Sequence, residues 1–244
     1  MTRFFLAMPL LVLAVPAHAE DRTFAIGSFD RVRVEGPFRV IVTVGASPAG
    51  TASGDARTIG NLDVRVDGTT LSVRAGTGGW GEQGGAGGSA APVIRVATPA
   101  LHSIVTIGAA QVRVESAGGA GGAWRGQRLD VSLTGSGTFA APSIDADQLV
   151  ATVLGSGTMT LGGRAARVRL TTSGTASVAA AALVANDLIV RLDGNGTIEA
   201  QARYTAAVTS TGLGGVTVYG RPACTVRADA GGPVVCGKQD APAG

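Results

Sequence analysis

The chain reads Leu129-Asp-Val-Ser-Leu-Thr-Gly-Ser-Gly-Thr138, and the pattern returns as Leu149-Val-Ala-Thr-Val-Leu-Gly-Ser-Gly-Thr158. In each copy apolar residues occupy every other position and a glycine-rich turn follows. Three further copies run over residues 166–175, 188–197 and 206–215. Aligned on a shared glycine, the copies have a period of roughly 20 residues, with this glycine at Gly137, Gly157, Gly174, Gly196 and Gly214. Such a period is typical of a solenoid, in which each unit buries its apolar face only against its neighbours.

Stacking the copies predicts the columns of side chains that a parallel β-solenoid needs. Alternate side chains of a strand point inward, and strands stacked in register place like residues above like. On this alignment one inward column holds Leu129, Leu149, Ala166, Leu188 and Ala206, and one outward column holds Ser132, Thr152, Arg169, Arg191 and Thr209. No helical period is visible. We therefore expect an all-β, single-domain parallel solenoid that ends near Cys236.

The region before the copies also predicts strands, interrupted by two glycine-rich loops. Residues 24–75 alternate apolar and polar positions, and Asp67-Gly68 predicts a tight turn because both residues tolerate positive φ. The stretches 76–91 and 117–126 are rich in glycine and have no hydrophobic period, so we expect loops there. Each loop carries one of the two tryptophans of the chain, Trp80 and Trp124.

The first nineteen residues are typical of an export signal. Arg3 gives a positive start, residues 4–15 form an apolar run, and Ala17-His18-Ala19 is a typical cleavage site. The run is short for a membrane span, and no second stretch of membrane length follows. We expect a signal peptide at residues 1–19, cleavage after Ala19, and a mature domain of residues 20–244 without a transmembrane segment. The expected location is the periplasm or the medium.

Composition and charge exclude other classes of protein. Apolar residues make up 45% of the chain, which argues against disorder, and aromatic residues make up only 4%. Small aliphatic side chains suit thin stacked layers with narrow interiors. The formal net charge is +3, and the arginines are interspersed with acids, so no basic block points to a nucleic-acid partner.

The two cysteines of the chain, Cys224 and Cys236, both lie near the end of the sequence. In an oxidising compartment such a pair predicts a disulfide, here one that holds the last layer of the stack. A zinc site lacks ligands, because His102 is the only histidine after residue 19. The C-x-x-C spacing of redox sites is also absent.

Three stretches, taken in order, carry a resemblance to a known family. They are Phe29-Asp-Arg-Val-Arg-Val-Glu-Gly-Pro-Phe-Arg-Val40, then Val93-Ile-Arg-Val-Ala-Thr-Pro-Ala-Leu101 leading to Gly108-Ala109, and then the run of Gly-Ser-Gly steps. The chain resembles the head GIN-domain family of auto-transporter adhesin heads, whose function is uncharacterised, over about residues 29–220. The resemblance implies a right-handed parallel β-helix and an exported protein. It brings no catalytic residues with it.

Three hypotheses for the function remain. The first is a non-catalytic, adhesin-like binding or surface-interaction module whose partner is a glycan or an envelope or surface protein. The second is a structural, envelope-associated periplasmic scaffold. The third, a carbohydrate-active β-helix enzyme, is disfavoured because no two acids stack in the alignment, whereas paired catalytic carboxylates need close placement. We expect no enzyme, no cofactor and no metal; the oxygen-rich stretch 193–199 lacks the spacing of a calcium loop.

Five residues are candidates for contact with a ligand or partner. Trp80 and Trp124 lie outside the copies, and exposed indole rings stack on sugars or anchor protein partners. Arg125 adjoins Trp124 and would serve an anionic group. Arg169 and Arg191 stand on adjacent layers of the alignment, about 5 Å apart, where they would bind an anionic glycan. The alternatives are that each indole covers an open layer and that the two arginines form a solvated ladder.

Overall fold

The computed structural model describes residues 19–76, 91–119, 122–229 and 231–238, which form one sheet and one short helix. The prediction of an all-β, single-domain chain is confirmed. Residues 1–18 of the expected signal peptide, most of the 76–91 loop and Trp80 lie outside the described residues. The elements are β1 (Ala19–Phe24), β2 (Arg31–Glu35), β3 (Arg39–Val44), β4 (Ala49–Asp55), α1 (Ala56–Gly60), β5 (Leu62–Asp67), β6 (Thr70–Ala75), β7 (Val93–Thr98), β8 (Ser103–Gly108), β9 (Gln111–Ser116), β10 (Trp124–Gly135), β11 (Thr138–Gly155), β12 (Thr158–Gly174), β13 (Ser177–Gly194), β14 (Thr197–Ser210), β15 (Gly215–Gly220), β16 (Ala223–Ala228) and β17 (Val234–Lys238).

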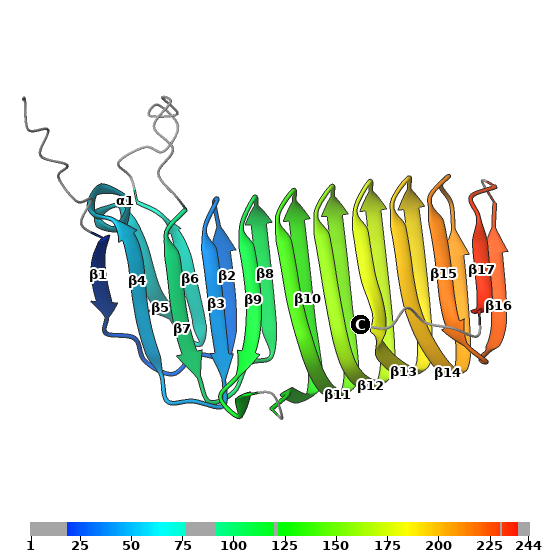
Figure 1. Ribbon diagram of the computed structural model, residues 1–244, viewed down its shortest axis with the longest axis horizontal. Coiled ribbons are helices and arrows are strands. Elements are labelled where there is room, and N and C mark those ends of the chain that lie inside the picture. Colours follow the sequence, from blue (N-terminus) through cyan, green and yellow to red (C-terminus); the bar gives the residue numbers. More distant parts are fainter. Residues whose placement is uncertain (1–18, 77–90, 120–121, 230, 239–244) are drawn as a thin grey trace, which may run out of the picture.

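From β10 to β17 the layers stack in the order of the sequence, as the green-to-red strands of Figure 1 show. The long strands β11, β12 and β13 each pair in parallel with the strand that follows along most of their length. Alternate residues are buried, so the layers share one apolar core. One inward column of this core holds Leu129, Leu149, Val168, Leu188 and Ala206.

The third copy is therefore two residues out of the register that the sequence alignment suggested. Val168, and not Ala166, lies between Leu149 and Leu188. The cause is the turn, because Gly174 lies level with Gly155 and thus matches the first glycine of the Gly-Ser-Gly step, not the second. The alignment on a single shared glycine was wrong for this layer.

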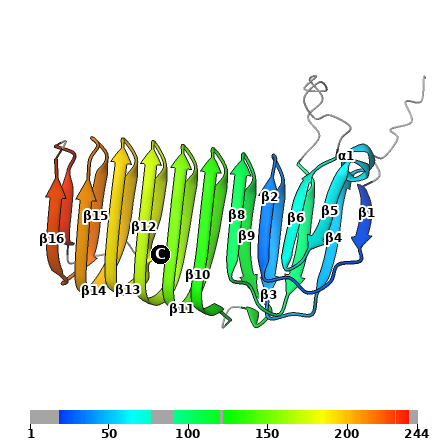
Figure 2. The same cartoon turned by 180° about the vertical axis from the view of Figure 1, so that it is seen from behind.

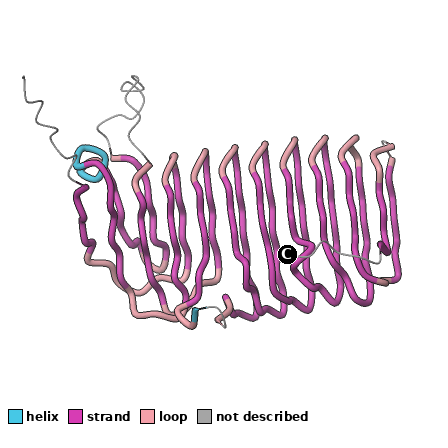
Figure 3. Tube along the Cα trace, in the orientation of Figure 1, coloured by secondary structure: helices cyan, strands magenta, loops and turns pink. Residues whose placement is uncertain are grey.

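Glycine is required where the layers turn along one edge, which Figure 3 shows as a row of loops above the strands. Gly155 adopts φ +118, a conformation that side-chain-bearing residues rarely reach. A Cβ atom on Gly155 would also lie 2.7 Å from the carbonyl oxygen of Gly135 in the layer below. At this position the backbones of successive turns therefore pass too closely for a side chain.

The first half of the molecule stacks in an order that differs from its sequence. β2 pairs with both β6 and β8, and β3 pairs with both β7 and β9. The layer of β2 and β3 thus lies between two layers that follow it in the chain, as Figures 1 and 2 show from opposite sides. The pairs β1–β4, β4–β7 and β5–β6 are antiparallel. The sheet is mixed, and the expectation of a wholly parallel sheet is wrong at this end.

Two local features shape this first end. The Asp67-Gly68 turn joins β5 to β6 as predicted, with Gly68 at φ +59. The helix α1, which no periodicity indicated, begins after Asp55, whose carboxylate accepts hydrogen bonds from the backbone N–H groups of Arg57 and Thr58. Five residues are too few to display a helical period. Nothing helical in the described ranges has both the length and the apolar character that a membrane crossing requires.

The predicted disulfide between Cys224 and Cys236 is confirmed and joins β16 to β17 in the last layer. Cys224 lies level with the buried Ala206, and Cys236 lies level with the buried Val218. Both sulfurs therefore belong to columns that are apolar in the layers beneath. Val226 also continues a buried column but is 43% exposed, because no described strand covers β16 on its outer side. The covalent bond holds a layer that packing secures on one side only.

Candidate binding groove

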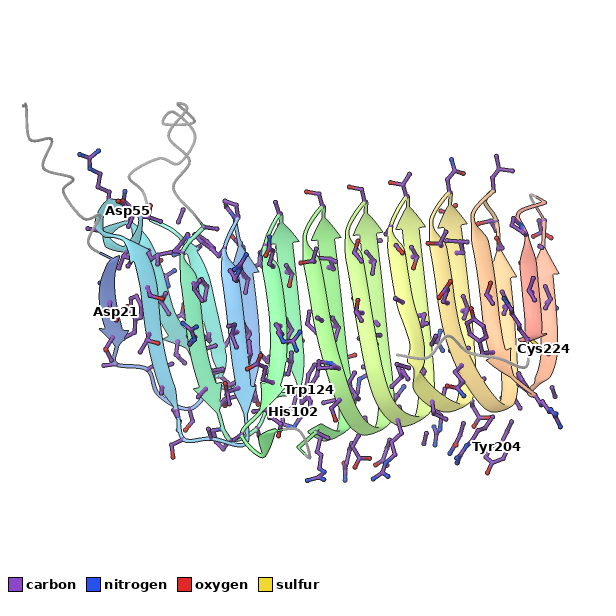
Figure 4. All side chains as sticks on the ribbon, viewed as in Figure 1. Asp21, Asp55, His102, Trp124, Tyr204 and Cys224 are labelled. Atoms are coloured by element: carbon purple, nitrogen blue, oxygen red, sulfur yellow. A yellow bond between two sulfur atoms is a disulfide. The ribbon has the colours of Figure 1, made fainter. Side chains whose placement is uncertain are left out.

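A groove of about 670 Å³ opens on the edge of the stack opposite the glycine turns, near Tyr204 in Figure 4. It forms where β11 to β14 bend and their pairing register shifts. Its charged lining residues are Arg125, Asp145, Arg164 and Arg203, and its polar ones are Ser143 and Asn186. We call it the arginine groove. Its floor contains small residues such as Gly163 and Ala165, which leave room between the longer side chains.

Parallel pairing places the first three of these side chains on successive layers. Arg125 lies level with Asp145, and Asp145 lies level with Arg164. The Arg164 guanidinium donates from Nε to Oδ1 of Asp145 at 2.9 Å and from Nη2 to Oδ2 at 2.8 Å. Nε of Arg125 lies 3.5 Å from the same Oδ2. One carboxylate is thus held between two arginines.

The electrostatics of this triad keep Asp145 ionised. The hydrogen bonds from Arg164, assisted by the charges of Arg164 and Arg125, hold the pKa of the Asp145 carboxyl below its ordinary value. The same contact raises the pKa of the Arg164 guanidinium. A carboxyl in this state is a poor proton donor near neutral pH, which argues against a role for Asp145 as a general acid.

The next layers of the groove lack a matching carboxylate. Arg164 lies level with Val184, and beyond it the lining continues with Asn186 and Arg203. Arg203 is exposed and makes no ion pair with any residue that the structure describes. Three arginines and one aspartate therefore line the groove, which leaves its lining with a positive excess.

An aromatic ring stands beside the groove. Tyr204 follows Arg203 in the chain and is 63% exposed, the one aromatic side chain of the described ranges that is largely open to solvent. Its phenol lies at the lower edge in Figure 4. No sequence pattern marked Tyr204, Arg203 or Arg164, because the copies cover the strands around the glycine turns and not the bends on the opposite edge.

Trp124 is not an exposed contact residue, so that hypothesis is wrong. It is the first residue of β10 and is 1% exposed. Its indole Nε1 donates a hydrogen bond of 2.7 Å to the carbonyl oxygen of Leu101. The loop predicted at 117–126 therefore ends before residue 124. The alternative, in which the indole covers a layer, describes this residue. Trp80 lies outside the described residues.

The three predicted arginines do not form one site. Arg125 lines the arginine groove. Arg169 lies level with Ile189, and Arg191 lies level with Thr171, so these two arginines belong to different columns. The expectation that the two side chains stack about 5 Å apart is thus wrong, and the alternative of a solvated ladder fails with it. The cause is the same two-residue shift that displaced Ala166. Whether either one contacts a ligand stays a prediction.

Within the described ranges, no three His, Cys, Asp or Glu side chains gather closely enough to hold a metal ion. The donors of the groove are mostly guanidinium groups, which bind anions and not cations.

Solved structures share this fold at low sequence identity. A "putative adhesin" from Bacteroides fragilis matches with a TM-score of 0.78 and 18% identity, covering 90% of this chain and 97% of that chain. A "putative lipid binding protein" from Parabacteroides distasonis matches with a TM-score of 0.68 and 16% identity, covering 88% of this chain and 95% of that chain. No curated protein sequence matches the chain.

The family comparison agrees with the resemblance found in the sequence. The family described as "Putative auto-transporter adhesin, head GIN domain" matches residues 28–222. This range runs from just before β2 to the start of the last layer, and it includes every charged residue of the arginine groove. The chain belongs to this family.

Proposed function

We propose that the chain is an exported, non-catalytic, adhesin-like binding module that contacts its partner through the arginine groove. The observation that carries this proposal is the groove itself, in which three arginines and one aspartate surround a floor of small residues. Arginine side chains in a concave setting recognise carboxylate, sulfate or phosphate groups. The stack beneath supplies a rigid support, because each layer is hydrogen-bonded to its neighbours.

The proposal includes the fold and the location that the sequence suggests. We propose that the layers wind as a right-handed parallel β-helix with a mixed first end. We also propose that residues 1–19 direct export and that the mature domain, residues 20–244, works in the periplasm or outside the cell. The Cys224–Cys236 disulfide supports an oxidising compartment.

The absence of catalysis is supported by the state of the one acid in the groove. Asp145 is engaged by two arginines and its pKa is lowered. A glycosidase-type mechanism needs a second carboxyl group across from the first, one of them with a raised pKa. The lining of the groove contains no second acid.

Binding to cell envelopes tests the proposal. The full chain would be produced with its own signal, and the exported protein would be measured against isolated envelope fractions and intact bacteria. We expect saturable binding that the double variant Arg164→Ala/Arg203→Ala weakens by about tenfold or more, because both guanidinium groups contact the partner. Arg95→Ala is the matched control, since Arg95 is exposed on β7, away from the groove.

Two outcomes would contradict the proposal. One is a chain that binds no envelope or surface component, which would favour the scaffold hypothesis. The other is binding that the double variant leaves unchanged, which would place the contact elsewhere on the stack.

A further inference from the structure

We infer that the part of the arginine groove between Arg164 and Arg203 receives the carboxylate of an acidic polysaccharide, and that Tyr204 stacks against a sugar ring. The inference rests on the proposed binding function and names the class of partner.

The first half of the groove shows how this edge accommodates a carboxylate. Asp145 lies one layer from Arg125 and one layer from Arg164, and both arginines contact it. With layers about 4.8 Å apart, the two arginines stand about 10 Å apart along the stack, with a single acid between them. The chain thus contains its own example of a bound carboxylate.

The second half of the groove again has arginines on layers two apart, and its lining contains no acid between them. From Arg164 the column passes to Val184 and then to Gln201, and Arg203 follows Gln201 by two residues in that second layer. The side chains of the layer in between which line the groove, Val184 and Asn186, are neutral, and the adjacent Asp187 accepts a hydrogen bond of 2.6 Å from the Thr205 hydroxyl. A carboxylate supplied by a ligand would stand between Arg164 and Arg203, displaced along the strand from the column in which Asp145 stands between Arg125 and Arg164.

The donors needed for this contact are present. Arg164 donates to Asp145 from Nε and Nη2, which leaves its Nη1 group to donate to a ligand. Arg203 makes no ion pair with a described residue, so its fork of donors is available. Asn186 offers both an amide donor and an amide acceptor, the pair that a sugar hydroxyl can use.

Tyr204 distinguishes a sugar from a simple anion. A largely exposed phenol next to an arginine offers a flat apolar face beside a positive charge. Pyranose rings have an apolar face and polar edges, so a uronic acid unit could stack on the ring while its carboxylate meets Arg203. An inorganic anion would gain nothing from the ring.

A membrane surface fits the groove less well than a polysaccharide. Peripheral membrane binding requires several apolar side chains on the same face as the basic ones. Of the large apolar side chains that the described residues expose, Tyr204 borders the groove, whereas Leu213 lies at the turns on the opposite edge. Arg221 follows β15 and adds an exposed basic side chain in the layer after Arg203, outside the groove lining. A linear polyanion matches this row of charges.

The test uses galacturonate oligomers, their methyl esters and vesicles that contain phosphatidylglycerol. Binding to the exported full chain would be measured by calorimetry at about 20 mM and about 150 mM salt, since screening weakens exposed charge contacts. We expect binding of the oligomers that the higher salt weakens, and at least about tenfold weaker binding of the esters, which lack the charge.

Variants locate the contact. Arg203→Ala and Tyr204→Ala should each weaken binding of the oligomers by about five- to tenfold, through loss of a charged donor and of an aromatic face. Tyr204→Phe keeps the ring and should bind nearly as the native chain does. Arg95→Ala should leave the affinity unchanged. Circular dichroism checks that each exposed substitution leaves the fold intact.

The results separate the inference from the proposed function. Equal affinity for acid and ester, or unchanged binding by Arg203→Ala, overturns the inference. Binding to vesicles without binding to oligomers overturns it in favour of a lipid surface. A chain that binds envelopes through the groove but binds no oligomer retains the proposed function and loses the inferred partner.

Discussion

The two halves of the molecule use the same kind of strand but are assembled in different ways. Between residues 124 and 238 each layer lies on the layer that precedes it in the sequence. Between residues 19 and 116 the layer of β2 and β3 is enclosed by later layers, and three strand pairs are antiparallel. In the second half the layers stack in the order of the sequence, and in the first half they do not.

The difference shows what a repeat can and cannot prescribe. In the second half a strand meets its partner after roughly 20 residues, so the pattern of one copy predicts the next. In the first half Arg39 donates a hydrogen bond to Gln111, 72 residues further on, at 3.3 Å. Such distant pairings require the chain between them to close a long loop, and no local pattern specifies them.

Trp124 lies at the junction of the two halves, and its removal should have the largest effect. It is the first residue of β10, where the layers begin to stack in the order of the sequence. Its indole N–H donates a hydrogen bond to the carbonyl oxygen of Leu101, just before β8. Trp124→Ala should destabilise the chain by about 3–5 kcal/mol, because it leaves a cavity and an unpaired carbonyl oxygen. Urea unfolding measures the loss, and Trp124→Phe, which keeps most of the packing, should lose less. A change below about 0.5 kcal/mol for Trp124→Ala would contradict this account of the junction.

The disulfide should matter next, and only at the far end of the second half. Replacing Cys224 and Cys236 by serine removes a closed loop with a sequence separation of 12 residues. The expected loss is about 3 kcal/mol if the loop-closure entropy of the unfolded chain governs the effect. Hydrogen exchange should show faster opening of β16 and β17, with β2 to β9 unaffected. Equal acceleration in both halves would contradict a local role.

A glycine on the turn edge should contribute less to stability than the disulfide does. Comparing it with a glycine of the first half shows whether the requirement belongs to the turns. Gly155→Ala forces a side chain into φ +118 and against the backbone of the layer below, at an expected loss of about 2 kcal/mol. Gly60→Ala is the control in the first half, because nothing lies within 4 Å of the added Cβ and the residue ends α1. The control should be neutral or slightly stabilising. Thermal unfolding of the two variants compares them, and a Gly155→Ala variant as stable as the native chain would show that this turn position tolerates a side chain.

The smallest effect concerns pH and the arginine groove. The folded-state pKa of Asp145 is lowered, so its contribution to stability is complete above the unfolded pKa of about 3.9 and is lost as pH falls through the folded pKa. Asp145→Asn should cost less than about 1 kcal/mol at neutral pH, since the arginines are exposed. The difference between native chain and variant should shrink toward zero in acid.

Chemical denaturation at a series of pH values gives that difference. Asp229→Asn serves as the control for loss of one negative charge, because the Asp229 side chain is exposed and makes no ion pair among the described residues. A difference for Asp145→Asn that stays constant down to strong acid would show that the arginines do not hold the carboxylate.

Sequence reasoning identified the strands better than it identified the site. Alternation predicted the buried side of β2, β3, β6 and the strands of the copies, and the cysteine pair predicted the disulfide, because both signals act over short distances. The register of the third copy was wrong, since Gly174 could be matched to either glycine of a Gly-Ser-Gly step. The same error put Arg169 beside Arg191. Trp124 was placed in a loop because its neighbours are glycines, although its own burial keeps it in the core.

The amino-acid sequence by itself determined that this chain is built from alternating strands and glycine turns, that its last layer is held by a disulfide, and that it resembles the head GIN-domain family. Side-chain period and turn chemistry are properties of neighbouring residues, and they are legible without a structure. Only the tertiary structure decided the order of the first layers, the burial of Trp124, and the position of Arg125, Asp145, Arg164 and Arg203 along one groove. These depend on which edges and bends stack on one another, and residues brought together by stacking are far apart in the chain.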